Sequence, residues 1–268
     1  MSDGKPLALV TGASAGIGAT FARRLARDGY SLILVARRAD RLEEIARELG
    51  GAETLPADLT SEDDLRRVEA RIENAANLEL LVNNAGFGIM GRFYQRPIEG
   101  FVKMHQLHVM AAMRLSHAAL RGMVERGRGG LINVSSVAGF IQSPGAVCYN
   151  ATKAWMTSFT EGLHLDLVSS RSPVRVQALC PGFTYSEFHD VIAMDRKTIP
   201  KWMWCSAEDV VTASLNGLSA GKVVVIPGFR YRVLVALVRL LPKFLVRRAM
   251  LNSSRRTGRT AQPTAGQP

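Results

Sequence analysis

Leu7-Ala8-Leu9-Val10-Thr11-Gly12-Ala13-Ser14-Ala15-Gly16-Ile17-Gly18 is the stretch of this sequence that decides the fold. Its first four residues form a short apolar run, which predicts a buried strand. Ile17, Phe21 and Leu25 then follow a helical spacing, so the glycines lie in a turn between a strand and a helix. Such a turn lets backbone N–H groups approach a pyrophosphate at the helix N-terminus. The alternative is a turn that is tight for structural reasons alone.

Two arginines follow the next apolar run, Ser31 to Ala36. At this place an acidic residue binds the ribose 2′-hydroxyl of NAD, whereas arginine accommodates the 2′-phosphate of NADP. Arg37 and Arg38 therefore favour NADP as the cofactor, with NADPH preferred over NADH. The alternative is a solvated helix start, in which Asp40 caps a helix over residues 41–49.

Apolar runs and helical patterns alternate through the rest of the body. We predict further strands at 53–57, 78–82, 131–134, 174–179 and 223–226, with helices between them. This alternation predicts an α/β fold, a parallel sheet covered on both faces that binds its ligand at the carboxyl ends of the strands. With 268 residues and 47% hydrophobic content, the chain can bury one large core. We expect a single dinucleotide-binding domain over residues 1–229.

A tyrosine and a lysine four residues apart provide candidate chemistry. Tyr149 and Lys153 would lie on one face of a helix, with Ser136 thirteen residues upstream. A nearby ammonium favours the phenolate, so Tyr149 could exchange a proton with an alcohol or a ketone near neutral pH. Taken alone, the pattern also fits an ordinary pair on an amphipathic helix.

Six motifs stand together in a familiar order: Thr11-Gly12-x-x-x-Gly16-x-Gly18, Asp58, Asn83-Asn84-Ala85-Gly86, Ser136, Tyr149-x-x-x-Lys153 and Pro181-Gly182. In order and spacing, residues 5–228 resemble the short-chain dehydrogenase/reductase family, and the arginine pair resembles its NADP-preferring members. The resemblance implies a Rossmann-like, doubly wound sheet of about seven parallel strands. It also implies an oxidoreductase that moves a hydride between NADP(H) and a carbonyl or alcohol.

The resemblance also assigns a role to each matching residue. Ser136 would bind the substrate oxygen, Tyr149 would act as the general acid, and Lys153 would hold the nicotinamide ribose and lower the pKa of Tyr149. The residues expected to bind the pyrophosphate and adenosine ribose are Thr11, Gly12, Ser14, Gly16, Ile17 and Gly18. Arg37 and Arg38 would bind the 2′-phosphate, Asp58 and Leu59 the adenine, and Asn84, Ala85 and Gly86 would shape the floor under the cofactor. The remaining cofactor-binding residues would be Tyr149 and Lys153, with Pro181, Gly182 and Thr184 at the nicotinamide amide.

The sequence departs from the family pattern at two positions. Where relatives carry an asparagine whose water relays protons to the lysine, this chain has His108, within Leu107-His108-Val109. His108 could carry the relay, and is then a catalytic residue, or it could be a packed helix histidine that leaves the relay broken. Ser186 replaces a threonine four residues after Pro181-Gly182 and keeps the hydroxyl.

The net charge of +11 is concentrated near the C-terminus. Nine of the 34 Lys and Arg residues lie between Arg230 and Arg259, where there is no acid, so the rest of the chain has 25 basic and 23 acidic residues. Residues 230–251 read as a basic amphipathic helical extension divided at Pro242, and residues 252–268 as a disordered tail. The extension either contacts a membrane surface peripherally or folds over the substrate entrance or a neighbouring subunit. We expect no nucleic-acid binding, because the basic segment lacks interleaved stacking aromatics and no recognition motif accompanies it.

Several other expectations concern the surroundings of the site. The start of the chain has no signal-peptide pattern, which indicates a cytoplasmic protein, and the cysteines and histidines form no metal-ligand spacing, so we expect no metal. Residues 183–204 are rich in large side chains; they form an apolar lid over an apolar substrate, or they pack on the body. The resemblance implies a homodimer or homotetramer. Two other functions remain open, an NADP-binding protein with weak or no turnover and a membrane-surface scaffold.

Overall fold

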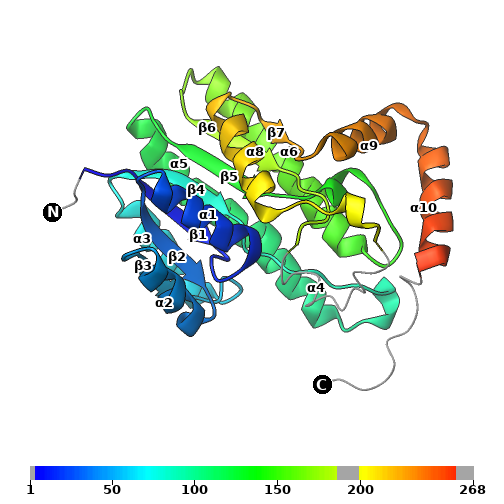
Figure 1. Cartoon of the computed structure of the whole chain (residues 1–268), viewed down its shortest axis with the longest axis horizontal. Helices are drawn as coiled ribbons and strands as arrows, with labels where there is room; N and C mark the ends of the chain where they lie inside the picture. Colours follow the sequence, from blue (N-terminus) through cyan, green and yellow to red (C-terminus); the bar gives the residue numbers. More distant parts are fainter. Residues whose placement is uncertain (1–3, 186–198, 258–268) are drawn as a thin grey trace.

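Seven parallel strands form one sheet in the computed structural model, which describes residues 4–185 and 199–257. The strand order is β3-β2-β1-β4-β5-β6-β7 (Figure 1). The strands are β1 (Leu7–Thr11), β2 (Ser31–Ala36), β3 (Glu53–Pro56), β4 (Leu78–Asn83), β5 (Gly130–Val134), β6 (Arg175–Leu179) and β7 (Val224–Val225). The chain runs outward from β1 to β3, returns to β4 beside β1, and continues to β7. Ligands bind where the strand order reverses in this way.

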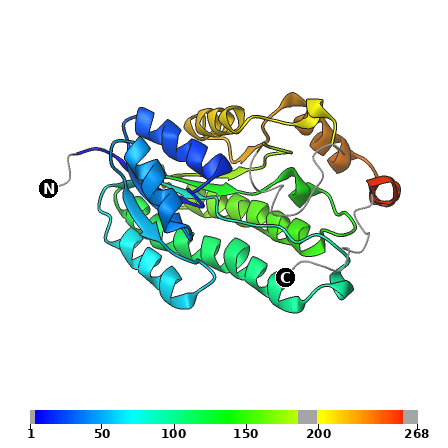
Figure 2. The ribbon, with the colours of Figure 1, turned by 60° about the horizontal axis from the view of Figure 1, so that its bottom comes forward.

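Helices cover both faces of the sheet (Figure 2). One layer contains α1 (Gly16–Arg27), α2 (Ala39–Glu48) and α8 (Ala207–Ser219), and the other contains α3 (Glu62–Glu73), α5 (Ala112–Glu125) and α6 (Val147–Ser169). Side chains of β1 alternate between them: Leu7 and Leu9 pack toward α3 and α5, Ala8 and Val10 toward α1 and α2. The predicted doubly wound single-domain fold is confirmed.

The start of one helix differs from the alternative drawn from the sequence. Helix α2 begins at Ala39 with Arg38 at its N-cap, so Asp40 lies in the first turn and is not the N-cap. The long helix begins at Ile98, after Pro97. It runs as α4 (Ile98–His105), a π-helical segment η2 (Gln106–Ala111) and α5 without interruption. A π segment of this kind is rare and occurs often at functional sites.

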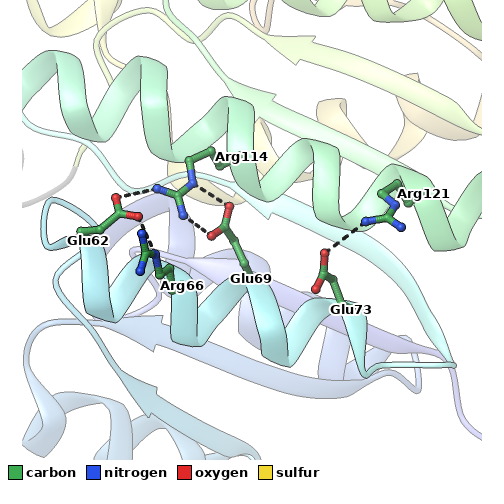
Figure 3. A network of polar contacts seen from close by, with 6 residues as sticks. All are labelled: Glu62, Arg66, Glu69, Glu73, Arg114 and Arg121. Carbon is green, nitrogen blue, oxygen red and sulfur yellow. Dashed lines mark hydrogen bonds and ion pairs between the residues drawn. The ribbon is translucent and has the colours of Figure 1, made fainter.

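Helices α3 and α5 are joined by charged side chains along their exposed edge (Figure 3). Arg114 donates to both carboxylate oxygens of Glu69 and, at 2.7 Å, to Glu62, which also pairs with Arg66. Arg121 reaches Glu73 at 3.6 Å. Since Arg114 and Glu69 are largely shielded from solvent, their bidentate pair stabilises the helix contact more than the exposed Arg121 pair does.

The C-terminal extension is helical and begins on the body of the domain. It contains α9 (Phe229–Leu240) and α10 (Lys243–Thr257), divided at Pro242 as predicted. Tyr231 and Val235 of α9 are buried. The tail predicted from residue 252 is corrected at its start, because α10 continues to Thr257. Residues 258–268 lie outside the described part.

No helix in the described ranges 4–185 and 199–257 has the length and apolar character needed to cross a membrane.

Candidate active site

A cavity of about 640 Å³ opens at the carboxyl ends of the strands. Among the predicted site residues, those that line it are Gly12, Ser14, Gly16, Ile17, Arg37, Arg38, Asp58, Leu59, Asn84, Ala85, Gly86, Ser136, Tyr149, Lys153, Pro181, Gly182 and Thr184. Thr11, Gly18 and His108 lie behind its wall. The structure therefore brings almost every predicted residue to one continuous cavity, although these residues are scattered over 174 positions of sequence from 11 to 184.

The glycine-rich turn is held by the side chains of Thr11 in β1 and of Asn84, which directly follows β4. Thr11 Oγ1 accepts the backbone N–H groups of Asn84 and Ala85 at 2.9 and 3.0 Å. Asn84 Nδ2 donates to the carbonyls of Thr11 and Gly12. Gly12 has a φ of +65°, which only glycine adopts readily. At Gly18 an added Cβ would lie 2.2 Å from the Gly12 carbonyl oxygen, so glycine lets α1 approach the turn.

The end of the cavity next to β2 is cationic. Arg37 and Arg38 are exposed just beyond β2, and Arg38 Nη2 donates to Ser14 Oγ at 3.1 Å. Asp58 accepts hydrogen bonds from the backbone and hydroxyl of Thr60. Burial alone would raise the pKa of Asp58, but the Thr60 hydrogen bonds and the charge of Arg37 hold the pKa below its usual value.

This donor set fits a phosphorylated dinucleotide. Helix α1 begins at Gly16 beside the cavity, with no side-chain cap and no acid in its first turn, so its N–H groups are not used by its own side chains. The two guanidinium groups lie beside it, and Asp58 is engaged with Thr60.

Ser136, Tyr149 and Lys153 meet at the other end of the cavity. Ser136 follows β5, and its Oγ accepts the N–H of Ala138 at 3.1 Å and hydrogen-bonds Tyr149. Lys153 Nζ donates to the carbonyl of Val134 at 2.8 Å and lies 5.8 Å from the centre of the Tyr149 ring. The long helix α6 carries both residues, one turn apart, so a single rigid element sets their spacing.

The proton affinities of this pair differ from the prediction. Burial raises the pKa of Tyr149 to about 12, although its hydrogen bond with Ser136 opposes the shift. Burial lowers the pKa of Lys153 to about 8. The lowered tyrosine pKa that the sequence predicts is not found here, because desolvation of the phenol outweighs the favourable contacts. The phenol of Tyr149 therefore keeps its proton at neutral pH.

His108 lies between the cavity wall and α6. It is fully buried within the π segment. Its Nε2 accepts the backbone N–H of Phe87 at 3.1 Å, and its Nδ1 lies 2.9 Å from Thr152 Oγ1. Its ring packs edge-on against the ring of Tyr149, with 6.0 Å between centroids.

The C-terminal extension contributes three cavity residues that sequence reasoning did not assign: Tyr231, Leu234 and Met250. The Tyr231 hydroxyl accepts the N–H of Phe183 and donates to the carbonyl of Met203, and its ring fills the space beside Gly182. The available signal was the apolar spacing of Tyr231, Leu234 and Val235, which marks the inner face of α9. The structure describes only part of the lid predicted over residues 183–204, because residues 186–198, including Ser186, lie outside the described residues.

Metal-ligand geometry is not found in the part of the chain that the structure describes, where no three His, Cys, Asp or Glu side chains cluster. Cys148 and Cys180 are buried thiols and Cys205 is partly exposed.

Comparison with known proteins agrees with this geometry. The family model for short chain dehydrogenases matches residues 6–197. An uncharacterized oxidoreductase of Myxococcus xanthus is 38% identical over 185 residues, which are 67% of this chain and 72% of the relative. A solved short-chain dehydrogenase from Sphingobium yanoikuyae, in complex with NADPH, is 35% identical with a TM-score of 0.79, covering 98% of both chains. A bulky-bulky ketone specific alcohol dehydrogenase from Comamonas testosteroni is 30% identical with a TM-score of 0.75, covering 98% of this chain and 97% of that one.

Proposed function

Because the chain belongs to the short-chain dehydrogenase family, it is a dehydrogenase of CH–OH and C=O groups, and we propose that it reduces bulky apolar ketones or aldehydes with NADPH. The observation that carries this proposal is the meeting of Ser136, Tyr149 and Lys153 in the same cavity as the exposed arginine pair. The neighbour from Sphingobium yanoikuyae, solved with NADPH, supports the choice of cofactor.

The residues of the chain would hold NADPH along the cavity. The N–H groups at the start of α1 would bind the pyrophosphate, and Arg37 and Arg38 the 2′-phosphate. Lys153 would bind the nicotinamide ribose. When bound, NADPH supplies the hydride that a carbonyl carbon accepts.

Two hydroxyl groups serve the oxygen of the substrate. Negative charge develops on the carbonyl oxygen during reduction, so donors placed there stabilise the transition state. Ser136 Oγ donates a hydrogen bond to this oxygen, and Tyr149 Oη donates and then transfers its proton. Burial keeps that proton on Tyr149 at neutral pH.

The substrate half of the cavity is apolar. Ile141, Phe183, Met203, Leu234 and Met250 line it. Apolar walls favour substrates with large hydrocarbon groups on the carbonyl. The Comamonas neighbour, a bulky-bulky ketone specific alcohol dehydrogenase, supports this class.

The test is oxidation of NADPH and NADH by the purified protein with a panel of small and bulky ketones and aldehydes. We expect turnover with NADPH that increases with the apolar size of the substrate. Tight NADPH binding without turnover on the whole panel would instead favour the NADP-binding protein that the substitution at His108 leaves open.

Replacing Arg37 by alanine should weaken selection for the phosphorylated cofactor. Loss of one charge-assisted hydrogen bond to phosphate predicts a fall in kcat/KM for NADPH of roughly 10-fold or more, with little change for NADH. Steady-state kinetics with both cofactors measure this ratio. Arg41→Ala is the matched control, because Arg41 pairs with Glu44 on α2. An equal loss with both cofactors would contradict the assignment of Arg37 to the 2′-phosphate.

A second proposal concerns the outer surface of the extension. Eight exposed large apolar side chains lie on α9, α10 and the turn between them: Phe229, Val233, Leu237, Leu240, Leu241, Phe244, Leu245 and Leu251. Exposed Lys243, Arg247 and Arg248 accompany them, and the extension has no acid. Apolar side chains flanked by cations fit the headgroup region of an anionic bilayer. We propose that this surface contacts membranes peripherally.

Vesicle sedimentation tests this contact. We expect binding to phosphatidylglycerol vesicles and not to phosphatidylcholine vesicles, with affinity reduced at least about 10-fold when Lys243, Arg247 and Arg248 become glutamine, since each cation contributes roughly 1 kcal/mol near such a surface. The matched control replaces three exposed cations elsewhere, Arg47, Arg171 and Lys222. Equal binding of both variants would reject the extension as the contact.

The homodimer or homotetramer implied by the resemblance also remains a proposal. Exposed Val147, Leu165 and Val168 on α6 support it.

A further inference from the structure

The side chain of His108 connects two parts of the active site that are distant in sequence. Phe87 belongs to the turn after β4 that lines the cavity, and Thr152 lies on α6 between Tyr149 and Lys153. His108 contacts both, through Nε2 at 3.1 Å and Nδ1 at 2.9 Å. Gly86 makes this possible, since an added Cβ there would lie 2.9 Å from His108 Nε2.

The partners of the imidazole assign its protons. A backbone N–H only donates, so Nε2 must be the unprotonated acceptor of Phe87. Burial, with the nearby charges of Lys153 and His105, holds the pKa of His108 well below its usual value, so the ring is neutral and its one proton is on Nδ1. Nδ1 then donates to Thr152 Oγ1, which in turn donates to the carbonyl of Tyr149 at 3.0 Å.

This arrangement differs from a proton relay. Both ring nitrogens are engaged with Phe87 and Thr152, while Lys153 donates to the carbonyl of Val134. A relay nitrogen must take up and release protons, and either change would break one of the two hydrogen bonds. The bridge instead fixes the distance between the turn at Phe87 and the backbone of Tyr149.

We propose that His108 is a positioning residue that, through Thr152, holds the catalytic helix α6 in register with the cavity turn at Phe87. The proposal rests on the proposed reductase function for its kinetic consequence, and on the geometry alone for the bridge. The π segment fits this role, because it places His108 in the body of the long helix and aims its ring at α6.

The first experiment tests the hydrogen-bonded bridge through His108 by NMR spectroscopy and does not depend on enzyme turnover. In ¹⁵N-histidine-labelled protein, the signal that disappears in His108→Asn should show a protonated Nδ1 and an unprotonated Nε2, unchanged between pH 6 and 8. A proton on Nε2, or a histidinium at pH 6, would overturn the proposal even if the protein is an active reductase. If wild-type protein shows no turnover, the reductase proposal fails. The spectrum would still show whether His108 forms the proposed bridge.

The second experiment uses kinetics. Both His108→Asn and Thr152→Val should lower kcat about 10- to 100-fold with the KM for NADPH nearly unchanged, and both should lower the melting temperature, because each leaves a buried donor without its acceptor. Thr152→Ser keeps the hydroxyl and should stay close to wild type, and the double variant should be no worse than either single one. His117→Asn, on the exposed side of α5, is the matched control.

Two kinetic outcomes would overturn the role. One is a His108→Asn variant as active as wild type or more active. The other is a Thr152→Val variant with unchanged kcat. If His108→Asn does not fold, comparison of Thr152→Val with Thr152→Ser still tests the positioning role.

Discussion

Tyr149→Phe is expected to reduce NADPH-dependent carbonyl reduction by roughly 10³-fold while leaving NADPH binding nearly intact. The change removes one hydroxyl, which we propose as both the proton donor and one of the two hydrogen-bond donors to the substrate oxygen. The ring, its burial and its packing against His108 all remain. Single-turnover kinetics with NADPH measure the chemical step, and fluorescence titration measures cofactor affinity.

Tyr94→Phe is the matched control for this substitution. Tyr94 is exposed, and its hydroxyl accepts a hydrogen bond from Arg92. Its loss should change kcat by less than about 2-fold, as expected for a surface position. If Tyr149→Phe retained more than a tenth of the wild-type rate, another group would have to donate the proton, and the assignment of Tyr149 would fail.

Gly18→Ala is expected to have the second large effect, on stability and cofactor binding together. The new methyl group would lie 2.2 Å from the Gly12 carbonyl oxygen and 2.5 Å from Asn84 Nδ2. Backbone atoms there are held by the Asn84 hydrogen bonds, so α1 must move away from the turn. We expect a loss of roughly 2–3 kcal/mol in the free energy of unfolding and at least about 100-fold weaker NADPH binding.

Gly162→Ala also adds one methyl group, but we expect it to raise the free energy of unfolding instead of lowering it. Gly162 is an exposed residue within α6, and a Cβ there meets no atom within 4 Å. Alanine should stabilise the protein by about 0.5–1 kcal/mol, because it restricts the unfolded chain. Chemical denaturation compares the two variants. Equal stabilities would show that close packing at Gly18 has no special importance.

Much of the fold and site could be predicted because local signals agree with the tertiary structure. Most strands are largely apolar runs, so their positions follow from the local sequence, and parallel order places the motifs at one edge. The spacing of Tyr149 and Lys153 translates directly into one turn of helix. These predictions need no knowledge of distant contacts.

The parts that could not be predicted depend on such contacts. The pKa of Tyr149 is set by how deeply the phenol is buried, which the sequence does not state. Both hydrogen-bond partners of His108 lie on other elements, 21 and 44 residues away. Likewise, Leu234 and Met250 belong to an extension that the sequence leaves either on a membrane or on the body, and only packing places them at the cavity.

Tyr231 of the C-terminal extension packs against Gly182 of the main domain, so the two halves of the site come from different parts of the chain. The proposed cofactor half is built mainly from the first four strands and the turns that follow them, while part of the proposed substrate half comes from helices after the last strand. On this proposal, we expect substitutions in those last helices to change the range of accepted substrates while the nicotinamide-binding residues stay constant. A chain built in this way can change its substrate range through substitutions near its C-terminal end.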